Sequence, residues 1–152
     1  MKMNTDMDKS GILEMVKDRL MEKIRKFEDL IESTRASNND TKSSMGDKYE
    51  TGREMLQQEI NNLQRQLNET LNQQASLQKI TAEPCPKVQT GALVQTEKGL
   101  FYIAVSAGDL IVDNHKIITV SPESPLAKSM NALAPGQTFT VNNISQTIIE
   151  IW

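Results

Sequence analysis

Apolar residues recur at steps of three and four along the first third of the chain. They stand at Leu13, Val16, Leu20, Ile24, Phe27 and Ile31. Because this spacing places side chains on one face of an α-helix, the pattern predicts an amphipathic helix. Ser10 is a suitable residue to cap the N-terminus of this helix.

A second apolar series predicts a second helix. It consists of Leu56, Ile60, Leu63 and Leu67, and Leu77 continues the same seven-residue frame. Thr70 and Gln74 occupy this frame between Leu67 and Leu77, so the apolar face weakens there. Leu71 is expected to take over part of the contact.

The stretch between the two series, SNNDTKSSMG, is polar and contains many turn-forming residues. A narrow apolar face must be buried, and a short connection favours antiparallel packing of neighbouring helices. The sequence therefore predicts an antiparallel helical hairpin, or coiled coil, with its tip at residues 38–50. Arms of about 25–30 residues give a length of about 40 Å at 1.5 Å per residue. An intermolecular coiled coil is the alternative.

The second half of the chain has the pattern of a β-rich domain. All five prolines follow residue 80, and Pro84 and Pro86 mark a stiff joint. The stretches ALVQT and LFYIAVS flank the turn EKG, and DLIVDNHKIITV repeats this arrangement around DNH. Ser124 and Pro125 are expected to start a short helix, as its N-cap and first residue. TFTVNN and SQTIIEIW are the last two expected strands. We thus predict an α+β protein, with a hairpin at residues 1–83 and a β-rich domain at 84–152.

The composition of the chain argues against several classes of function. The chain is 38% hydrophobic and 24% charged, and its mean hydropathy is −0.47. It contains no apolar run of about 18 residues, so we expect a soluble, cytoplasmic protein without a membrane span. A net charge of −3 and an aromatic content of 4% argue against binding to a DNA duplex and against base stacking. Sequence-specific DNA binding is therefore not expected.

Candidate catalytic residues are few. Cys85 and His115 are the single cysteine and the single histidine, so neither a disulfide nor a histidine-rich metal site is expected. Cys85 is interpreted as an exposed or half-buried thiol, and His115 as a solvated residue in a turn. No nucleophile and base form a convincing pair, and no glycine-rich phosphate loop is present. These residues do not predict an enzyme.

Two carboxylates at the expected hairpin tip have two interpretations. Asp47 and Glu50 have the spacing of a capping box, in which an N-cap side chain and a carboxylate three residues later satisfy backbone N–H groups. They can also face the same side and bind a hard cation such as Mg²⁺. Because Mg²⁺ retains several waters and takes one or two protein carboxylates, such a pair would hold it weakly and need ligands from a partner.

The order of these parts resembles the Gre-type transcript-cleavage factors of bacteria. Two stretches carry the resemblance: GDKYE at residues 46–50, and ITVSPESPLAKSMNALAPGQTFTV with the closing IIEIW. The first is similar to the glycine, aspartate and glutamate of the Gre tip, and the second to the family's SP-x-SP helix start, glycine turn and final isoleucine-rich strand. The chain departs from the family after Glu50, where Thr51, Gly52 and Arg53 stand in place of an asparagine and a following aromatic residue.

The resemblance implies a function. An FKBP-like C-terminal domain would dock on RNA polymerase, and the coiled coil would enter its secondary channel. Asp47 and Glu50 would help to hold a Mg²⁺ shared with the polymerase, which then cleaves its own backtracked RNA; contact with the nascent RNA 3′ end is indirect. Tyr49, Ser124 and Pro125 are the expected partner-binding residues. The protein would then be an accessory factor and not itself an enzyme. A non-cleaving regulator of the channel, or a structural adaptor coiled coil, remains as an alternative.

Overall fold

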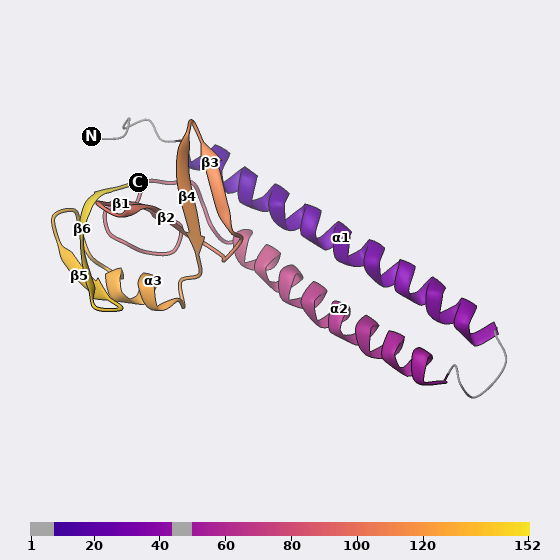
Figure 1. The fold of residues 1–152 in the computed structure, drawn as a ribbon. Coiled ribbons are helices and arrows are strands. Elements are labelled where there is room, and N and C mark those ends of the chain that lie inside the picture. The colour runs from indigo at the N-terminus through magenta and orange to yellow at the C-terminus, as the bar shows by residue number, and fades with distance from the viewer. Residues whose placement is uncertain (1–7, 44–49) are drawn as a thin grey trace. The chain divides into compact units, whose positions relative to one another are not determined.

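The computed structural model describes the backbone of residues 8–43 and 50–152, and the side chains of residues 8–37 and 52–152. Two long helices come first, α1 (Lys9–Ser43) and α2 (Glu50–Leu77). The strands and the short helix follow in the order β1 (Leu93–Thr96), β2 (Gly99–Ile103), β3 (Asp109–Val112), β4 (His115–Val120), α3 (Pro125–Met130), β5 (Thr138–Val141) and β6 (Ile144–Ile151). The expected α+β fold, a helical hairpin followed by a β-rich domain with one short helix, is confirmed (Figure 1).

The described chain forms two compact units. One consists of residues 19–74, and the other combines the N-terminal part of the chain through Asp18 with residues 75–152. This division differs from the boundary expected at residues 83 and 84. The physical reason is that the first turns of α1 and the end of α2 contribute buried residues, among them Ile12, Val16 and Leu77, to the unit that contains the sheet.

The first unit is a pair of helices with a shared apolar core. Figure 1 shows α1 and α2 side by side, and Ile24 and Ile31 of α1 form one buried cluster with Ile60 and Leu67 of α2. Phe27 and Leu63 pack against this cluster. Six of the residues that the three- and four-step pattern selected therefore join the arms, and the antiparallel hairpin is intramolecular.

Three local expectations for the helices were wrong. The N-cap of α1 is Asp8, whose Oδ1 accepts the Gly11 N–H at 3.0 Å, and not Ser10. Helix α1 continues through the polar stretch to Ser43, because none of these residues is a glycine or proline that would interrupt it. Leu71 is 41% exposed, and Thr70 is buried instead, with its hydroxyl donating to the Gln66 carbonyl at 2.9 Å.

The second unit contains a six-stranded sheet in the order β3-β4-β2-β1-β6-β5. Its neighbouring strands are antiparallel except β2 and β4, which are parallel. Tight turns join two of the hairpins: Asp113 and Asn114 link β3 to β4, and Asn142 and Asn143 link β5 to β6, all with positive φ. Such left-handed residue pairs match the twist of a two-residue hairpin. The expected strand pairs are thereby confirmed.

The sheet is buried on both faces. One face packs against α3 in a cluster that includes Val94, Phe101, Ile103, Met130 and Ile148. The alternate residues of the strands point to the opposite face. These are also buried, and they include Leu93, Tyr102 and Ile117.

Candidate functional site

The acidic segment lies at the reversal between the two helices. Asp47 and Tyr49 fall outside the described residues, and Glu50 is the first residue of α2, with a side chain that is also outside them. The structure therefore places the backbone of Glu50 at the start of α2 and leaves both interpretations of the carboxylates, as a cap and as metal ligands, as predictions. Among the side chains that the structure does describe, no three His, Cys, Asp or Glu groups form a metal site.

Gly52 follows in the first turns of α2. A Cβ atom added at this position would meet no atom within 4 Å. Neither close packing nor an unusual backbone angle therefore requires a glycine here. A glycine inside a helix costs about 0.5–1 kcal/mol relative to alanine, because its backbone loses more freedom on folding. This residue consequently weakens the start of α2 next to the acidic segment.

Ser124 and Pro125 start α3 as the sequence predicted. The Ser124 Oγ accepts the Ala127 N–H at 3.2 Å, and its hydroxyl donates to the Ser121 carbonyl at 2.7 Å. Pro125 occupies the first turn, where its missing N–H leaves no intrahelical bond unmade. Both hydrogen bonds of the serine are thus used within the fold, while Pro125 is exposed. Partner binding by these two residues stays a prediction.

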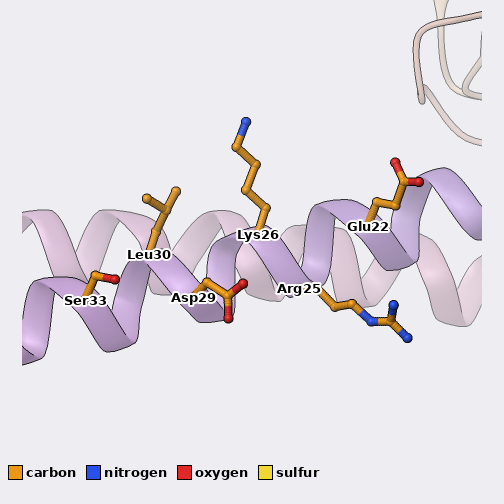
Figure 2. A pocket seen from close by; sticks show the side chains of 6 residues that line it. All are labelled: Glu22, Arg25, Lys26, Asp29, Leu30 and Ser33. Atoms are coloured by element: carbon orange, nitrogen blue, oxygen red, sulfur yellow. The ribbon is translucent and has the colours of Figure 1, made fainter.

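A shallow groove lies along α1 in the hairpin unit. Its lining residues are Glu22, Arg25, Lys26, Asp29, Leu30 and Ser33, which all belong to this one helix. Figure 2 shows that the Lys26 and Arg25 side chains point away from each other. Because Glu22 and Asp29 flank the two cations and the cations do not converge, this groove lacks the arrangement of a phosphate site.

A polar cluster that the sequence did not indicate lies in the unit that contains the sheet. Lys9 is only 4% exposed, although it is the first residue of α1. Its Nζ donates to the carbonyls of Glu83 at 2.6 Å, Gly91 at 2.8 Å and Trp152 at 3.1 Å. A buried ammonium group is tolerated when it is surrounded by acceptors. Lys9 therefore ties the first turn of α1 to two loop carbonyls and to the C-terminal residue.

Cys85 belongs to the same cluster. It is 7% exposed, so the expectation of an exposed or half-buried thiol was wrong. The reason is that Cys85 packs into the apolar core beneath α3 and that Lys9 reaches over it, with Nζ 3.6 Å from Sγ. Gln89 Nε2 also donates to Sγ, at 3.3 Å. His115, in contrast, is exposed as expected, but it is the first residue of β4 and not part of the turn.

Tyr102, on strand β2, has a buried hydroxyl. The side chain is fully buried, and the described residues offer its hydroxyl no hydrogen-bond partner. Burial raises the pKa of Tyr102 to about 12, and the neighbouring Cys85 adds to the increase. The phenol therefore stays protonated at neutral pH. Two further buried oxygens also have no partner among the described residues. They are Oε1 of Gln95 and Oε2 of Glu150, on strands β1 and β6, which pair at these residues.

Comparisons with known proteins find solved structures that align with most of this chain. The sequence matches no protein-family model and none of the curated proteins. Solved structures similar to the chain include the GreA factor homolog 1 (Gfh1) of Thermus thermophilus, at 14% identity over 90% of this chain and 94% of that chain, with a TM-score of 0.38. A structure of the transcription factor Gfh1 aligns at 13% identity, over 89% and 92% of the two chains, also with a TM-score of 0.38. Gfh1 of Thermus aquaticus aligns at 14% identity, over 88% and 92%, with a TM-score of 0.35. Similarity at this level does not assign a function.

The helices also bear on membrane association. In the part of the chain that the structure describes, none of them contains an apolar stretch of the length needed to cross a bilayer.

Proposed function

We propose that this protein is a transcription elongation factor of the Gre type, which binds RNA polymerase and extends its helical hairpin into the secondary channel. The observation that carries the proposal is the position of the reversal: α1 ends at Ser43 and α2 begins at Glu50. The segment that joins the arms therefore contains Asp47 and leads directly into Glu50. In the sequence, Asp47 belongs to this joining segment and Glu50 directly follows it.

The length of the hairpin is compatible with entry into a channel of the polymerase. Helix α2 has 28 residues, which corresponds to about 40 Å at 1.5 Å per residue. The apolar cluster of Ile24, Ile31, Ile60 and Leu67 joins the arms over part of this length. A hairpin of this kind can carry two carboxylates to an active centre that lies deep inside a partner.

The proposed chemistry is assistance to a two-metal reaction. Asp47 and Glu50 would supply oxygen ligands to a Mg²⁺ that the polymerase holds incompletely, and the polymerase would hydrolyse its own backtracked RNA. A metal held by these two acids together with the polymerase would supply positioning of the attacking water and stabilisation of the developing charge. Two carboxylates alone bind Mg²⁺ weakly. Metal binding would therefore depend on the assembled complex, and the protein would act as an accessory factor and not as an enzyme.

The remaining contacts are proposed from the same resemblance. The unit that contains the sheet would dock on the polymerase surface, with Ser124 and Pro125 at the start of α3 and Tyr49 near the tip as contact residues. Contact with the nascent RNA 3′ end would be indirect. The net charge of −3 offers little attraction to a DNA duplex, so sequence-specific DNA binding is not part of the proposal. A cytoplasmic location follows from the partner.

A reconstituted, backtracked elongation complex tests the proposal. We would measure the release of short RNA 3′ fragments with the wild-type protein and with the double variant Asp47→Asn, Glu50→Gln. Glu54→Gln is the matched control, because Glu54 is an exposed acid on the same helix. Stimulated cleavage that is lost in the double variant and kept in the control supports the proposal. Cleavage that is unchanged in the double variant refutes the role of the two acids.

A second candidate function is a channel regulator that does not stimulate cleavage. The observation that favours it is Gly52, which weakens the start of α2 although neither packing nor backbone geometry requires a glycine. The protein would then bind the polymerase and slow transcription without releasing RNA fragments. Both candidates fail if the affinity-purified protein does not bind purified RNA polymerase. The remaining interpretation is then a structural adaptor coiled coil.

A further inference from the structure

Strand β5 lies at one edge of the six-stranded sheet, where β6 is its neighbour. In the register of these two strands, Thr138 lies opposite Thr147. Two residues further on, Thr140 lies opposite Ser145. The Thr147 N–H donates to the Glu97 carboxylate, at 2.8 and 3.1 Å to its two oxygens, and is therefore not donated to Thr138. Because opposed residues of an antiparallel pair alternate between hydrogen-bonded and non-hydrogen-bonded, Thr138 and Thr140 both direct their N–H and C=O groups away from β6.

Four backbone groups are thus presented at this edge. The next residue of β6 agrees with the alternation, because Ile148 donates its N–H back to the Gln137 carbonyl at 2.9 Å. Thr138 and Thr140 are exposed, and no hydrogen bond within the described part of the chain uses their outward N–H and C=O groups. Such a row of donors and acceptors is a template for the pairing of another strand.

The β5 edge also lacks the features that prevent strand pairing. The 21 residues from Ser129 to Ile149 contain no Asp, Glu, Lys or Arg, although 24% of the whole chain is charged. Strand β5 contains no proline, and its register with β6 is regular. The opposite edge of the sheet is different, because Asp109 of β3 forms an ion pair with Lys116 at 3.2 Å. Natural proteins protect exposed edges with charges, prolines and bulges, so the unprotected β5 edge indicates a strand that a partner covers.

We propose that β5 pairs with β5 of a second copy of this chain, antiparallel and about a twofold axis at Phe139. Thr138 of each copy then lies opposite Thr140 of the other. Each of these two pairs exchanges two N–H···O=C hydrogen bonds, so every outward backbone group of both copies is used. The edge is therefore complementary to itself, as the interface of a closed dimer must be. Because the segment is uncharged, two copies meet there without repulsion between like charges, whereas a charged partner would find no opposite charge.

The side chains at the contact are compatible with this pairing. The hydroxyls of Thr138 and Thr140 lie on the exposed face, 3.2 Å from Thr147 Oγ1 and 3.1 Å from Ser145 Oγ. Across the axis threonine would face threonine, a pair that stabilises antiparallel strands. Phe139 is 5% exposed and remains in the core beneath the strand. A contact between two four-residue strands is smaller than the roughly 1,200 Å² of a stable complex, so the dimer is weak and depends on protein concentration.

Sedimentation velocity and amide hydrogen exchange of the full chain test the proposal, in a concentration series up to about 1 mM that covers weak association. We expect a shift from monomer to dimer along the series, and slower exchange of the Thr138 and Thr140 amides in parallel. In Thr140→Lys the two added ammonium groups start about 8 Å apart across the axis, from the strand spacing and the rise per residue. Their repulsion should raise the dissociation constant by about tenfold.

Ser145→Lys is the matched control. Thr140 and Ser145 share one hydroxyl contact, so each variant removes this contact and adds one positive charge to the same face. Ser145 lies one strand further from the axis, so its two copies are separated by three strand spacings, about 14 Å. This separation exceeds the Debye length of about 10 Å at 0.1 M salt. Ser145→Lys should therefore associate like the wild type.

The proposal is overturned if the wild type stays monomeric throughout the series, or if Thr140→Lys associates as tightly as Ser145→Lys. It is also overturned if the two amides become protected only when purified RNA polymerase is added, because the edge would then contact that partner and not a second copy. The inference does not rest on the proposed function. A negative result here leaves the RNA cleavage assay, and the role of the two acids that it tests, unaffected.

Discussion

Replacing Lys9 with methionine tests whether a single buried ammonium secures the start of α1. Methionine has a similar length and no charge, so it fills most of the same space without the donors. The three carbonyls of Glu83, Gly91 and Trp152 then lose a donor that lies 2.6–3.1 Å from each of them. The change thus removes the polar contact and leaves the packing nearly intact.

The size of the effect follows from two opposing contributions. A hydrogen bond that involves a charged group contributes about 1.5–3 kcal/mol, so three of them contribute roughly 5–9 kcal/mol. Taking an ammonium group out of water costs several kcal/mol, and methionine does not have this cost. The difference leaves an expected loss of about 2–4 kcal/mol in the free energy of unfolding. That is a large share of the stability of an ordinary domain.

Urea unfolding, followed by the fluorescence of the single tryptophan, measures this loss. Trp152 belongs to the same compact unit and accepts one of the three hydrogen bonds, so its emission reports on the region in question. We expect the midpoint to fall by about 1–2 M urea. Lys17→Met is the control, because Lys17 makes a solvent-exposed ion pair with Glu14 at 3.7 Å. Such pairs contribute about 0–1 kcal/mol. If Lys9→Met were no more destabilising than Lys17→Met, the reasoning about the buried ammonium would be refuted.

Three further changes have expected outcomes. Ile60→Ala, in the shared core of the hairpin, should lower the free energy of unfolding by about 2–4 kcal/mol, as measured by circular dichroism in urea. Met55→Ala, at a 66% exposed position of the same helix, is the control and should lower it by less than about 0.5 kcal/mol. Ser124→Ala removes the N-cap of α3 and should cost about 1 kcal/mol, seen as a lower thermal midpoint. The pKa of Tyr102 is raised from 10.0 to about 12, so its contribution to stability is complete below about pH 10 and is lost as the pH rises toward about 12. The stability of Tyr102→Phe, measured by alkaline unfolding, should not show this loss. An identical pH dependence in both proteins would contradict the prediction.

Features that depend on neighbouring residues could be predicted from the sequence. The three- and four-step spacing of Ile24, Phe27 and Ile31 is enough to define the buried face of α1, because the helical period is fixed by the backbone. The same holds for the N-cap and first residue of α3, where Ser124 and Pro125 act on their own turn. The N-cap of α1 was harder to predict, because serine and aspartate are both suitable residue types at this position. In the structure, Asp8 and not Ser10 accepts the helix N–H.

Features that depend on distant contacts could not be predicted. The acceptors of Lys9 lie 74, 82 and 143 positions away in the sequence, so no local pattern marks this residue as buried. The burial of Cys85 has the same origin, since it packs in one cluster with residues far along the chain, such as Met130 and Ile148. The parallel pairing of β2 with β4 likewise results from the order of strands in the sheet, which the alternation of side chains does not specify. The polar cluster around Lys9 could therefore be recognised only in the folded structure.

The buried cluster of the hairpin does not include the two proposed acids. Effects of the acids on RNA cleavage can therefore be measured separately from effects on folding. Of the described residues in the shared cluster, Ile31 and Ile60 are those nearest to the reversal in sequence, and both belong to the regular part of a helix. Conservative changes at Asp47 and Glu50 therefore leave this cluster in place. If the acids only cap α2, removing them costs about 1 kcal/mol of stability and leaves transcription unaffected. If they assist a shared Mg²⁺, RNA cleavage is lost at nearly unchanged stability, because the metal bonds exist only in the complex. Measuring unfolding and cleavage on the same variants thus distinguishes the two roles.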